Sequence, residues 1–163
     1  MPEKNLITVN NKVIDIEKFE PNETLLDWIR DTRKLKGTKE GCAEGDCGAC
    51  SILISPIQGG QFNPANSCLL KLGQIVGSEI ITVEGLGNHQ NPHPLQKSLS
   101  INGGSQCGFC TPGIVISLAG LLNLLVHPLL INIEFLVFLA DITSPNFLKL
   151  FDVNFLTEIL III

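Results

Sequence analysis

The distribution of apolar and polar residues over the first half of the chain predicts a set of short β-strands. Residues 6–9 and 13–16 alternate in polarity, and Asn10 and Asn11 between them can adopt positive φ and close a tight hairpin. Three further strands are expected at residues 51–54, near residues 66–70 and at residues 80–83, with a Pro- and Gly-rich turn over residues 55–64. We therefore expect this half of the chain to form a sheet.

One segment between these strands has apolar residues at the spacing of a helix face, namely Leu25, Leu26 and Ile29. We expect a helix over residues 23–34, with Asn22 as its N-cap and Gly37 as its stop signal. Two strands, a helix and then more short strands predict an α+β roll, in which one helix lies across a sheet.

The second half of the chain predicts loops and helices. Residues 85–94 are rich in Gly, Asn, His and Pro and are expected to form a loop, and residues 95–101 a short helix that ends before the glycines at 103–104. Thr111, followed by proline, is typical of a helix start, because the hydroxyl can cap the helix and proline suits the first turn. The expected apolar face of this helix consists of Ile114, Val115, Leu118, Leu121 and Leu122.

Length and charge narrow the class of protein. The chain of 163 residues suits one ordinary domain or two small ones. Its net charge of −5 gives no indication of a nucleic acid partner, so we expect none. Residues 1–4 are polar and no apolar segment follows them, so we expect no secretory signal and a cytoplasmic protein.

The last forty residues differ in composition from the rest. All 15 glycines lie between Gly37 and Gly120, whereas residues 124–163 contain none, and 26 of these 40 residues are Ala, Val, Ile, Leu or Phe. Polar residues interrupt each apolar window of about 20 residues, so we do not expect a membrane span. We expect a boundary near Asn123 and an aberrant apolar tail over residues 124–163.

Six cysteines carry the candidate chemistry. Cys42, Cys47 and Cys50 lie in one glycine-rich segment and Cys68 follows, which is the Cys-x4-Cys-x2-Cys spacing of plant-type [2Fe–2S] proteins. Without a secretory signal, clustered thiols indicate a metal site or catalysis rather than disulfides. Zinc is the alternative metal, but structural zinc sites use paired Cys knuckles, and no second pair surrounds Cys68. The three histidines show no ligand spacing.

Three glycines of the same segment are expected to contribute to cofactor binding. Gly41, Gly45 and Gly48 have no Cβ, so the backbone can bend sharply, approach a cluster closely and point its amides at the sulfurs. Glu44 and Asp46 are expected to be solvated loop charges and not catalytic carboxylates.

A second Cys-x2-Cys pair, Cys107 and Cys110, precedes the helix expected at Thr111. This pair could be a thioredoxin-type dithiol, because a helix N-terminus lowers the pKa of a thiol. That motif would directly follow a strand, however, and residues 102–105 are expected to form a loop. The pair could equally be half of a second cluster site, because the helix dipole favours an anionic group. The residues alone leave both interpretations open.

Several blocks of the chain together resemble a known family. They are residues 36–50, 66–70, 82–86 and 105–113. In this order they are similar to the xanthine dehydrogenase/aldehyde oxidase family, most closely to the N-terminal part of a bacterial xanthine dehydrogenase small subunit. The resemblance covers about residues 5–123.

The resemblance implies a fold and a set of site residues. It implies a β-grasp [2Fe–2S] ferredoxin domain over residues 1–86, and over residues 87–123 the start of an all-α domain that holds a second [2Fe–2S] cluster. The implied ligands of the first cluster are Cys42, Cys47, Cys50 and Cys68, and half of the second site is Cys107 and Cys110. Gln106 matches a family glutamine that contacts the molybdenum–pterin cofactor of the partner subunit.

The resemblance also implies a function. The expected protein is an iron–sulfur electron-transfer subunit or fragment of an oxidoreductase of the molybdenum hydroxylase type. It is expected to relay electrons from a molybdopterin centre towards FAD and NAD. The implied partners are a molybdopterin-binding large subunit and an FAD-binding domain or subunit, and the substrate site lies outside this chain. The alternatives are a stand-alone [2Fe–2S] ferredoxin-like carrier and a non-functional truncated product, with a dithiol oxidoreductase as the weakest.

The chain departs from the family pattern after about residue 123. The family closes its second cluster with a Cys-x-Cys pair further along, and no cysteine follows Cys110 here. Together with the apolar tail, this predicts a truncated or frame-shifted product. We expect one complete [2Fe–2S] site and a second site with two of its four cysteine ligands.

Overall fold

The computed structural model describes residues 5–16, 19–20 and 22–126. Nearly all of them belong to one compact unit, Met1–Leu124. The predicted apolar tail lies outside the described residues from residue 127 onwards.

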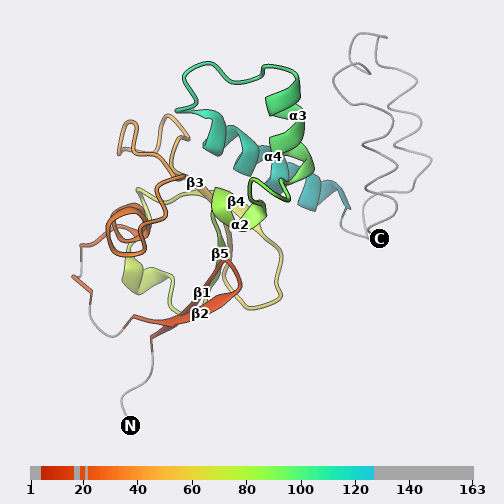
Figure 1. Ribbon diagram of the computed structural model, residues 1–163. Helices are drawn as coiled ribbons and strands as arrows, with labels where there is room; N and C mark the ends of the chain where they lie inside the picture. Colours follow the sequence, from red (N-terminus) through yellow and green to blue (C-terminus); the bar gives the residue numbers. More distant parts are fainter. Residues whose placement is uncertain (1–4, 17–18, 21, 127–163) are drawn as a thin grey trace. The chain divides into compact units, whose positions relative to one another are not determined.

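Five strands form one mixed sheet in the order β2-β1-β5-β3-β4 (Figure 1). The strands are β1 (Leu6–Val9), β2 (Lys12–Asp15), β3 (Ser51–Ser55), β4 (Asn63–Asn66) and β5 (Glu79–Ile81). β1 pairs antiparallel with β2 and parallel with β5, while β3 pairs antiparallel with both β5 and β4. A mixed sheet accompanied by helices confirms the predicted α+β class.

The hairpin between β1 and β2 confirms its prediction. Asn10 and Asn11 have φ of 50° and 64°, the left-handed conformation that a tight hairpin turn requires. The Asn10 side chain also reaches the end of β5, where its Nδ2 donates to Thr82 Oγ1 (3.0 Å) and its Oδ1 accepts from the Thr82 backbone N (2.9 Å). The turn is therefore fixed to the central strand of the sheet.

The first helix begins two residues later than predicted. α1 (Leu25–Asp27) is capped by Thr24, whose hydroxyl accepts a hydrogen bond from the backbone N of Asp27 (3.1 Å). The prediction that Asn22 is the N-cap is therefore wrong.

The helix also ends earlier than predicted. α1 continues as one π-helical turn, Trp28–Thr32, in which the backbone N of Arg33 bonds to the carbonyl of Trp28 (2.9 Å). Gly37 is not its stop signal. A π-turn adds one residue to a helical turn, and no sequence pattern used here marks it.

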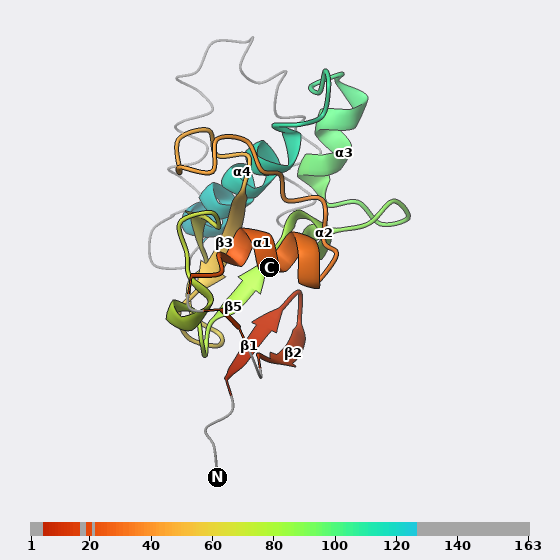
Figure 2. The ribbon, with the colours of Figure 1, turned by 90° about the vertical axis from the view of Figure 1, so that its left-hand side faces the viewer.

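The hydrophobic core lies between this helix and the sheet (Figure 2). Its buried members are Ile7, Val9, Ile16, Leu25, Trp28, Ile29, Ile52, Leu72, Ile75 and Ile80. Burying each large aliphatic side chain contributes about 1.5–3 kcal/mol to stability before the loss of chain entropy is counted. Leu26 is equally buried, but it packs against two cysteines instead.

Two strand predictions need correction. β4 ends at Asn66, so the strand predicted near residues 66–70 is wrong, and Cys68 lies in the turn after β4. This turn forms because the backbone N of Leu69 donates to the carbonyl of Asn66 (3.1 Å). The strand predicted at residues 80–83 ends at Ile81 in β5.

Short helical segments replace parts of the predicted loops and strands. A 3-10 turn at Leu72–Gln74 was not predicted, and α2 (Val83–Leu86) takes the end of the last predicted strand and the beginning of the predicted loop. α3 (Pro94–Ile101) confirms the predicted short helix. It is capped by His93, whose Nδ1 accepts from the backbone N of Leu95 (3.3 Å).

The last described helix, α4 (Thr111–Val126), begins where the sequence predicted a helix start. Its first hydrogen bond runs from the backbone N of Ile114 to the carbonyl of Cys110 (3.1 Å). Cys110, and not Thr111, therefore occupies the cap position.

The buried face of α4 agrees with the predicted one at Val115, with Leu118 and Leu122 half-buried, but it differs elsewhere. The buried residues are Val115, Ile116 and Ala119, whereas Ile114 and Leu121 are 44% and 49% exposed. The face is set by close contact with the sheet: a Cβ on Gly120 would lie 2.5 Å from Pro64 Cγ of β4 and 3.0 Å from Leu53 Cδ2 of β3. Glycine permits this approach, and it turns Ile114 and Leu121 towards solvent.

Candidate metal centre

Residues 41–50 form the first thiol loop, which leads into β3. The backbone N of Lys39 donates to the carbonyl of Ala49 (3.1 Å), which closes the base of the loop. Asn66 of β4 donates from Nδ2 to the carbonyl of Gly45 (2.7 Å), which holds the tip of the loop against the sheet. The loop is thus fastened at both its base and its tip.

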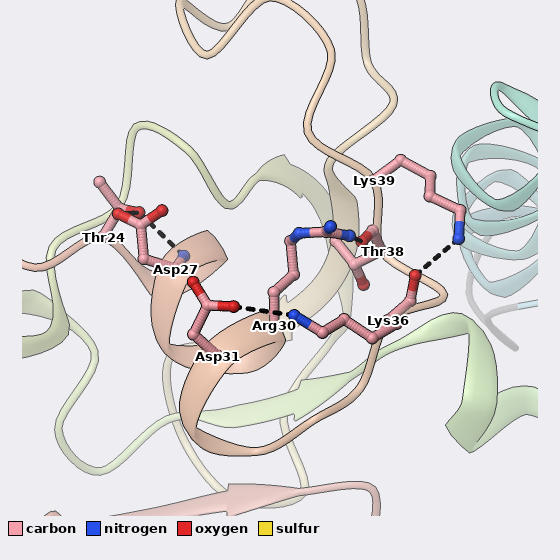
Figure 3. Close-up of polar contacts among 7 residues, drawn as sticks. All are labelled: Thr24, Asp27, Arg30, Asp31, Lys36, Thr38 and Lys39. Carbon is pink, nitrogen blue, oxygen red and sulfur yellow. Dashed lines mark hydrogen bonds and ion pairs between the residues drawn. The ribbon is translucent and has the colours of Figure 1, made fainter.

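Basic side chains fasten the segment that leads into this loop (Figure 3). The Arg30 guanidinium donates to the backbone carbonyl of Thr38 (2.6 Å). Lys36 pairs with Asp31 (2.8 Å), and the Lys39 ammonium donates to the backbone carbonyl of Lys36 (2.6 Å). These contacts join the chain before the loop to the first helix, so the loop starts from a fixed position.

The backbone of the first thiol loop turns sharply at three residues. Gly45, Gly48 and Ala43 have φ of 83°, 70° and 58°. Gly41 is crowded instead, because a Cβ there would lie 2.6 Å from the sulfur of Cys47. The glycines therefore allow the curled path and the close approach of backbone to sulfur.

Cys42 is surrounded by amides of this loop. Its sulfur accepts hydrogen bonds from the backbone N of Glu44, Asp46 and Cys47, at 3.5, 3.3 and 3.3 Å. The amides of Glu44 and then Cys47 lower the pKa of the Cys42 thiol from 9.0 to about 7. The backbone N of Cys42 in turn donates to the sulfur of Cys47 (3.4 Å). Cys42 and Cys47 thus form one pair of thiols, with Cys42 poised to be a thiolate.

Cys50 and Cys68 form a second, buried pair. Their sulfurs lie 3.4 Å apart, their exposed fractions are 2% and 7%, and Leu26 packs against both. Burial and then the hydrogen bond to Cys50 raise the pKa of the Cys68 thiol from 9.0 to about 11. A bound cation would be needed to make Cys68 a thiolate near neutral pH.

The donor set of the first site fits a two-iron cluster. A [2Fe–2S] cluster is held by four thiolates, two on each iron, and the four thiols stand in two pairs. In the described part of the chain, no three or more His, Cys, Asp or Glu side chains come together as they would around a single metal ion. All six cysteines are free thiols.

Residues 105–110 form the second thiol loop, before α4. Cys107, Cys110 and Gln106 are all exposed, and no hydrogen bond to their side chains is found among the described residues. The hydroxyls of Ser105 and Thr111 lie 2.8 Å apart and close the loop. The same two residues help to line a cavity of about 500 Å³. The loop is ordered by its ends, and its thiols are open to solvent.

Some residues that position the site carry no sequence motif. Leu26 covers the Cys50–Cys68 pair, and Asn66 holds the loop tip. Gly113 of α4 lies against the backbone of Gly48 and Ala49. It had one available signal, because a glycine inside a helix is unfavourable and often marks close packing.

The histidines in the described part of the chain do not gather into a metal site. His89 is exposed, His93 caps α3, and His127 lies outside the described residues. Burial lowers the pKa of His93, which keeps the ring a neutral acceptor. None of the helices in the described ranges combines the length and hydropathy needed to cross a membrane.

Several known proteins are similar to this chain in sequence. A family model for a [2Fe-2S] binding domain matches residues 82–129. A xanthine dehydrogenase of Blastobotrys adeninivorans is 47% identical over 119 residues, which are 71% of this chain and 8% of the relative. A human aldehyde oxidase is 41% identical over 123 residues, which are 72% of this chain and 9% of the relative. The chain thus spans about a tenth or less of the length of these curated relatives.

Solved structures share the fold. The aldehyde oxidoreductase of Desulfovibrio gigas has a TM-score of 0.67 at 36% identity, over 75% of this chain and 13% of that chain. The quinoline 2-oxidoreductase of Pseudomonas putida 86 has a TM-score of 0.65 at 37% identity, over 74% of this chain and 70% of that chain. The chain belongs to the xanthine dehydrogenase/aldehyde oxidase family. The family resemblance expected from the sequence blocks is thereby confirmed, and this family member covers the iron–sulfur region.

Proposed function

We propose that this chain is the iron–sulfur electron-transfer part of a molybdenum-containing hydroxylase of the xanthine dehydrogenase type. It takes electrons from a molybdopterin centre in a partner subunit and passes them towards FAD. The arrangement of four thiols in two pairs within the first site carries the proposal. Substrate binding and hydroxylation belong to another region of the enzyme.

In this proposal each thiol pair holds one iron. Cys42 and Cys47 take one iron and Cys50 and Cys68 the other, because the members of each pair are neighbours. A bound [2Fe–2S] cluster supplies a one-electron carrier. The three amides that donate to Cys42 favour added negative charge and raise the reduction potential.

The two pairs of thiols differ in their access to solvent, so the site has one buried side and one exposed side. Cys50, Cys68 and Leu26 exclude water from one side. Cys47 is exposed on the other side, so we assign electron exchange with a partner to the Cys47 edge.

The second thiol loop has a matching role in the proposal. Cys107 and Cys110 supply two of four ligands of a second [2Fe–2S] cluster in a helical domain that begins near residue 87, and the other two ligands come from elsewhere. The N-terminus of α4 supports this role, because its dipole favours an anionic group. Gln106, exposed in the second thiol loop, is assigned to the molybdopterin contact.

A stand-alone [2Fe–2S] carrier is the second candidate. The first site has four thiols within this chain, and the exposed Cys47 gives access to a diffusing partner. The second loop offers two thiols, which by themselves do not complete a cluster site.

Anaerobic isolation of the full chain from its own cells tests the proposal. We expect at least about two iron and two sulfide per chain, from the first site, together with a molybdenum-containing subunit. Iron without any molybdenum subunit would favour the carrier. Zinc in place of iron would overturn both candidates.

A further inference from the structure

Gly113, in the first turn of α4, lies directly against the backbone of the first thiol loop. A Cβ at this position would collide with the carbonyl oxygen of Gly48, and it would lie 3.1 Å from the Gly48 carbonyl carbon and 3.3 Å from Ala49 Cα. All of these are backbone atoms, so no change of rotamer can make room. Only glycine allows the helix to sit this close to the loop.

The loop side of this contact is held in place. The Gly48 carbonyl oxygen accepts hydrogen bonds from the Ser51 backbone N (3.1 Å) and from Ser51 Oγ (2.7 Å). Ala49 is 4% exposed, and its own carbonyl accepts from the backbone N of Lys39. The loop therefore cannot yield without breaking bonds that shape the first site.

The helix side is held as well. Val115 and Ile116, which follow Gly113, are 2% and 0% exposed. Gly120, two turns further along, packs against β3 and β4. α4 thus has contacts along the part that follows Gly113, and these oppose a shift of the helix.

The contact joins the two thiol loops through very short stretches of chain. Gly113 follows Cys110 by three residues, which is about one helical turn. Gly48 lies between Cys47 and Cys50. A displacement at this contact would therefore move one pair of thiols relative to the other.

We propose that Gly113 is a positioning residue that fixes the separation of the second cysteine pair from the first thiol site. This inference rests on the electron relay proposed above, because electron hopping slows steeply as the distance between carriers grows. Glycine is unfavourable inside a helix relative to alanine, and the close contact is the physical reason for its presence here.

The test compares Gly113→Ala with Gly120→Ala in the full chain. Both substitutions replace a glycine of α4 with a better helix former, and both add a crowded Cβ. The control differs in one respect, because Gly120 meets side chains of Leu53 and Pro64 and not the thiol loop. A general loss of packing affects both variants, whereas a change in the first site is expected from Gly113→Ala alone.

The first measurement is the distance from the reduced first cluster to a nitroxide on Cys110, obtained by pulsed EPR in a Cys107→Ser background. We expect one narrow distance in the parent chain, a longer or broader distribution in Gly113→Ala, and the parent distribution in Gly120→Ala. A broad distribution in the parent would overturn the proposal, even where Gly113→Ala fails to fold. An unchanged distance in Gly113→Ala, or the same change in both variants, would also overturn it.

The second measurement is amide hydrogen exchange of residues 41–50, which requires no cluster. We expect roughly tenfold faster exchange in Gly113→Ala and the parent rate in Gly120→Ala. Equal rates in both variants contradict the positioning role. If the parent chain binds no iron, the proposed function fails, whereas the exchange result still decides whether Gly113 holds the loop.

Discussion

The two thiol loops contain the same Cys-x2-Cys spacing in opposite environments. In the first loop, Cys50 is 2% exposed and has Cys68 beside it, and Cys42 receives three amide hydrogen bonds. In the second loop, Cys107 and Cys110 are exposed, and the described residues send no hydrogen bond to either sulfur. The spacing supplies donors, but the surrounding fold supplies the remaining ligand, the amides and the exclusion of water. A complete site therefore depends on contacts that are distant in sequence.

The largest expected difference between the loops is in iron binding. We expect Cys50→Ala to reduce the iron bound by the chain roughly tenfold or more, because it removes a ligand from the buried pair. We expect Cys110→Ala to leave the iron of the first site unchanged. Iron and sulfide analysis of anaerobically purified variants measures both effects. Loss of all iron in Cys110→Ala would show that the two loops are not independent in binding iron.

Each thiol loop contains a glycine with nearly the same φ, and the two glycines differ in what surrounds them. Gly45 and Gly108 have φ of 83° and 81°, but a Cβ on Gly45 would collide with the Leu69 side chain, whereas one on Gly108 would meet only Ser105 Oγ at 3.8 Å. Gly108→Ala should cost about 1–2 kcal/mol for the left-handed conformation alone. Gly45→Ala should cost about 1 kcal/mol more for moving Leu69, whose flexible end can yield. Urea unfolding followed by circular dichroism measures the two free energies, and equal values would contradict the difference in packing.

Thiol reactivity after removal of iron tests the electrostatics of the first loop. The pKa of Cys42 is about 7 and that of Cys68 is about 11. Only the thiolate is alkylated, so Cys42 should lose reactivity as the pH falls through about 7, while Cys68 should stay unreactive until far higher pH. At pH 7 we expect iodoacetamide to modify Cys42 at least about 100-fold faster than Cys68. Mass spectrometry of the alkylated peptides gives both rates, and similar rates at pH 7 would refute this assignment.

The smallest expected effect concerns the segment before the first thiol loop, which charged side chains hold in place. Arg30→Ala removes the hydrogen bond to the Thr38 carbonyl and should lower stability by about 1 kcal/mol, because the guanidinium is only partly buried. Asp31→Ala, the matched control, removes an exposed ion pair with Lys36 and should leave stability unchanged. Thermal unfolding of the two variants side by side is the measurement. A larger loss in Asp31→Ala than in Arg30→Ala would contradict the anchoring role.

Local sequence patterns predicted most helices and strands. They failed where a contact between residues far apart in sequence determines the structure. The hairpin at Asn10 and Asn11 was predictable because its turn chemistry is local. Cys68 was expected on a strand, but pairing of β4 with β3 ends at Asn66 and leaves this cysteine in a turn. The register of that pairing depends on residues far away in sequence.

The face of α4 could not be predicted for a different reason. Nearly every residue from Ile114 to Leu122 is apolar, so the sequence has no polar face to define the buried one. The small residues Gly113 and Gly120 decide the orientation, because they are where the helix approaches the first loop and the sheet. In the first site the cysteine spacing predicted the donors, but the pairing of sulfurs and the cover of Leu26 follow only from the fold.

The central claim is that this polypeptide completes one [2Fe–2S] site by itself, in the first loop with Cys68. Iron and sulfide counts on the full chain, purified alone under anaerobic conditions and combined with EPR after reduction, test it most directly. We expect about two iron and two sulfide per chain and a single EPR signal. Counts of about four with two signals, or zinc without iron, would contradict it.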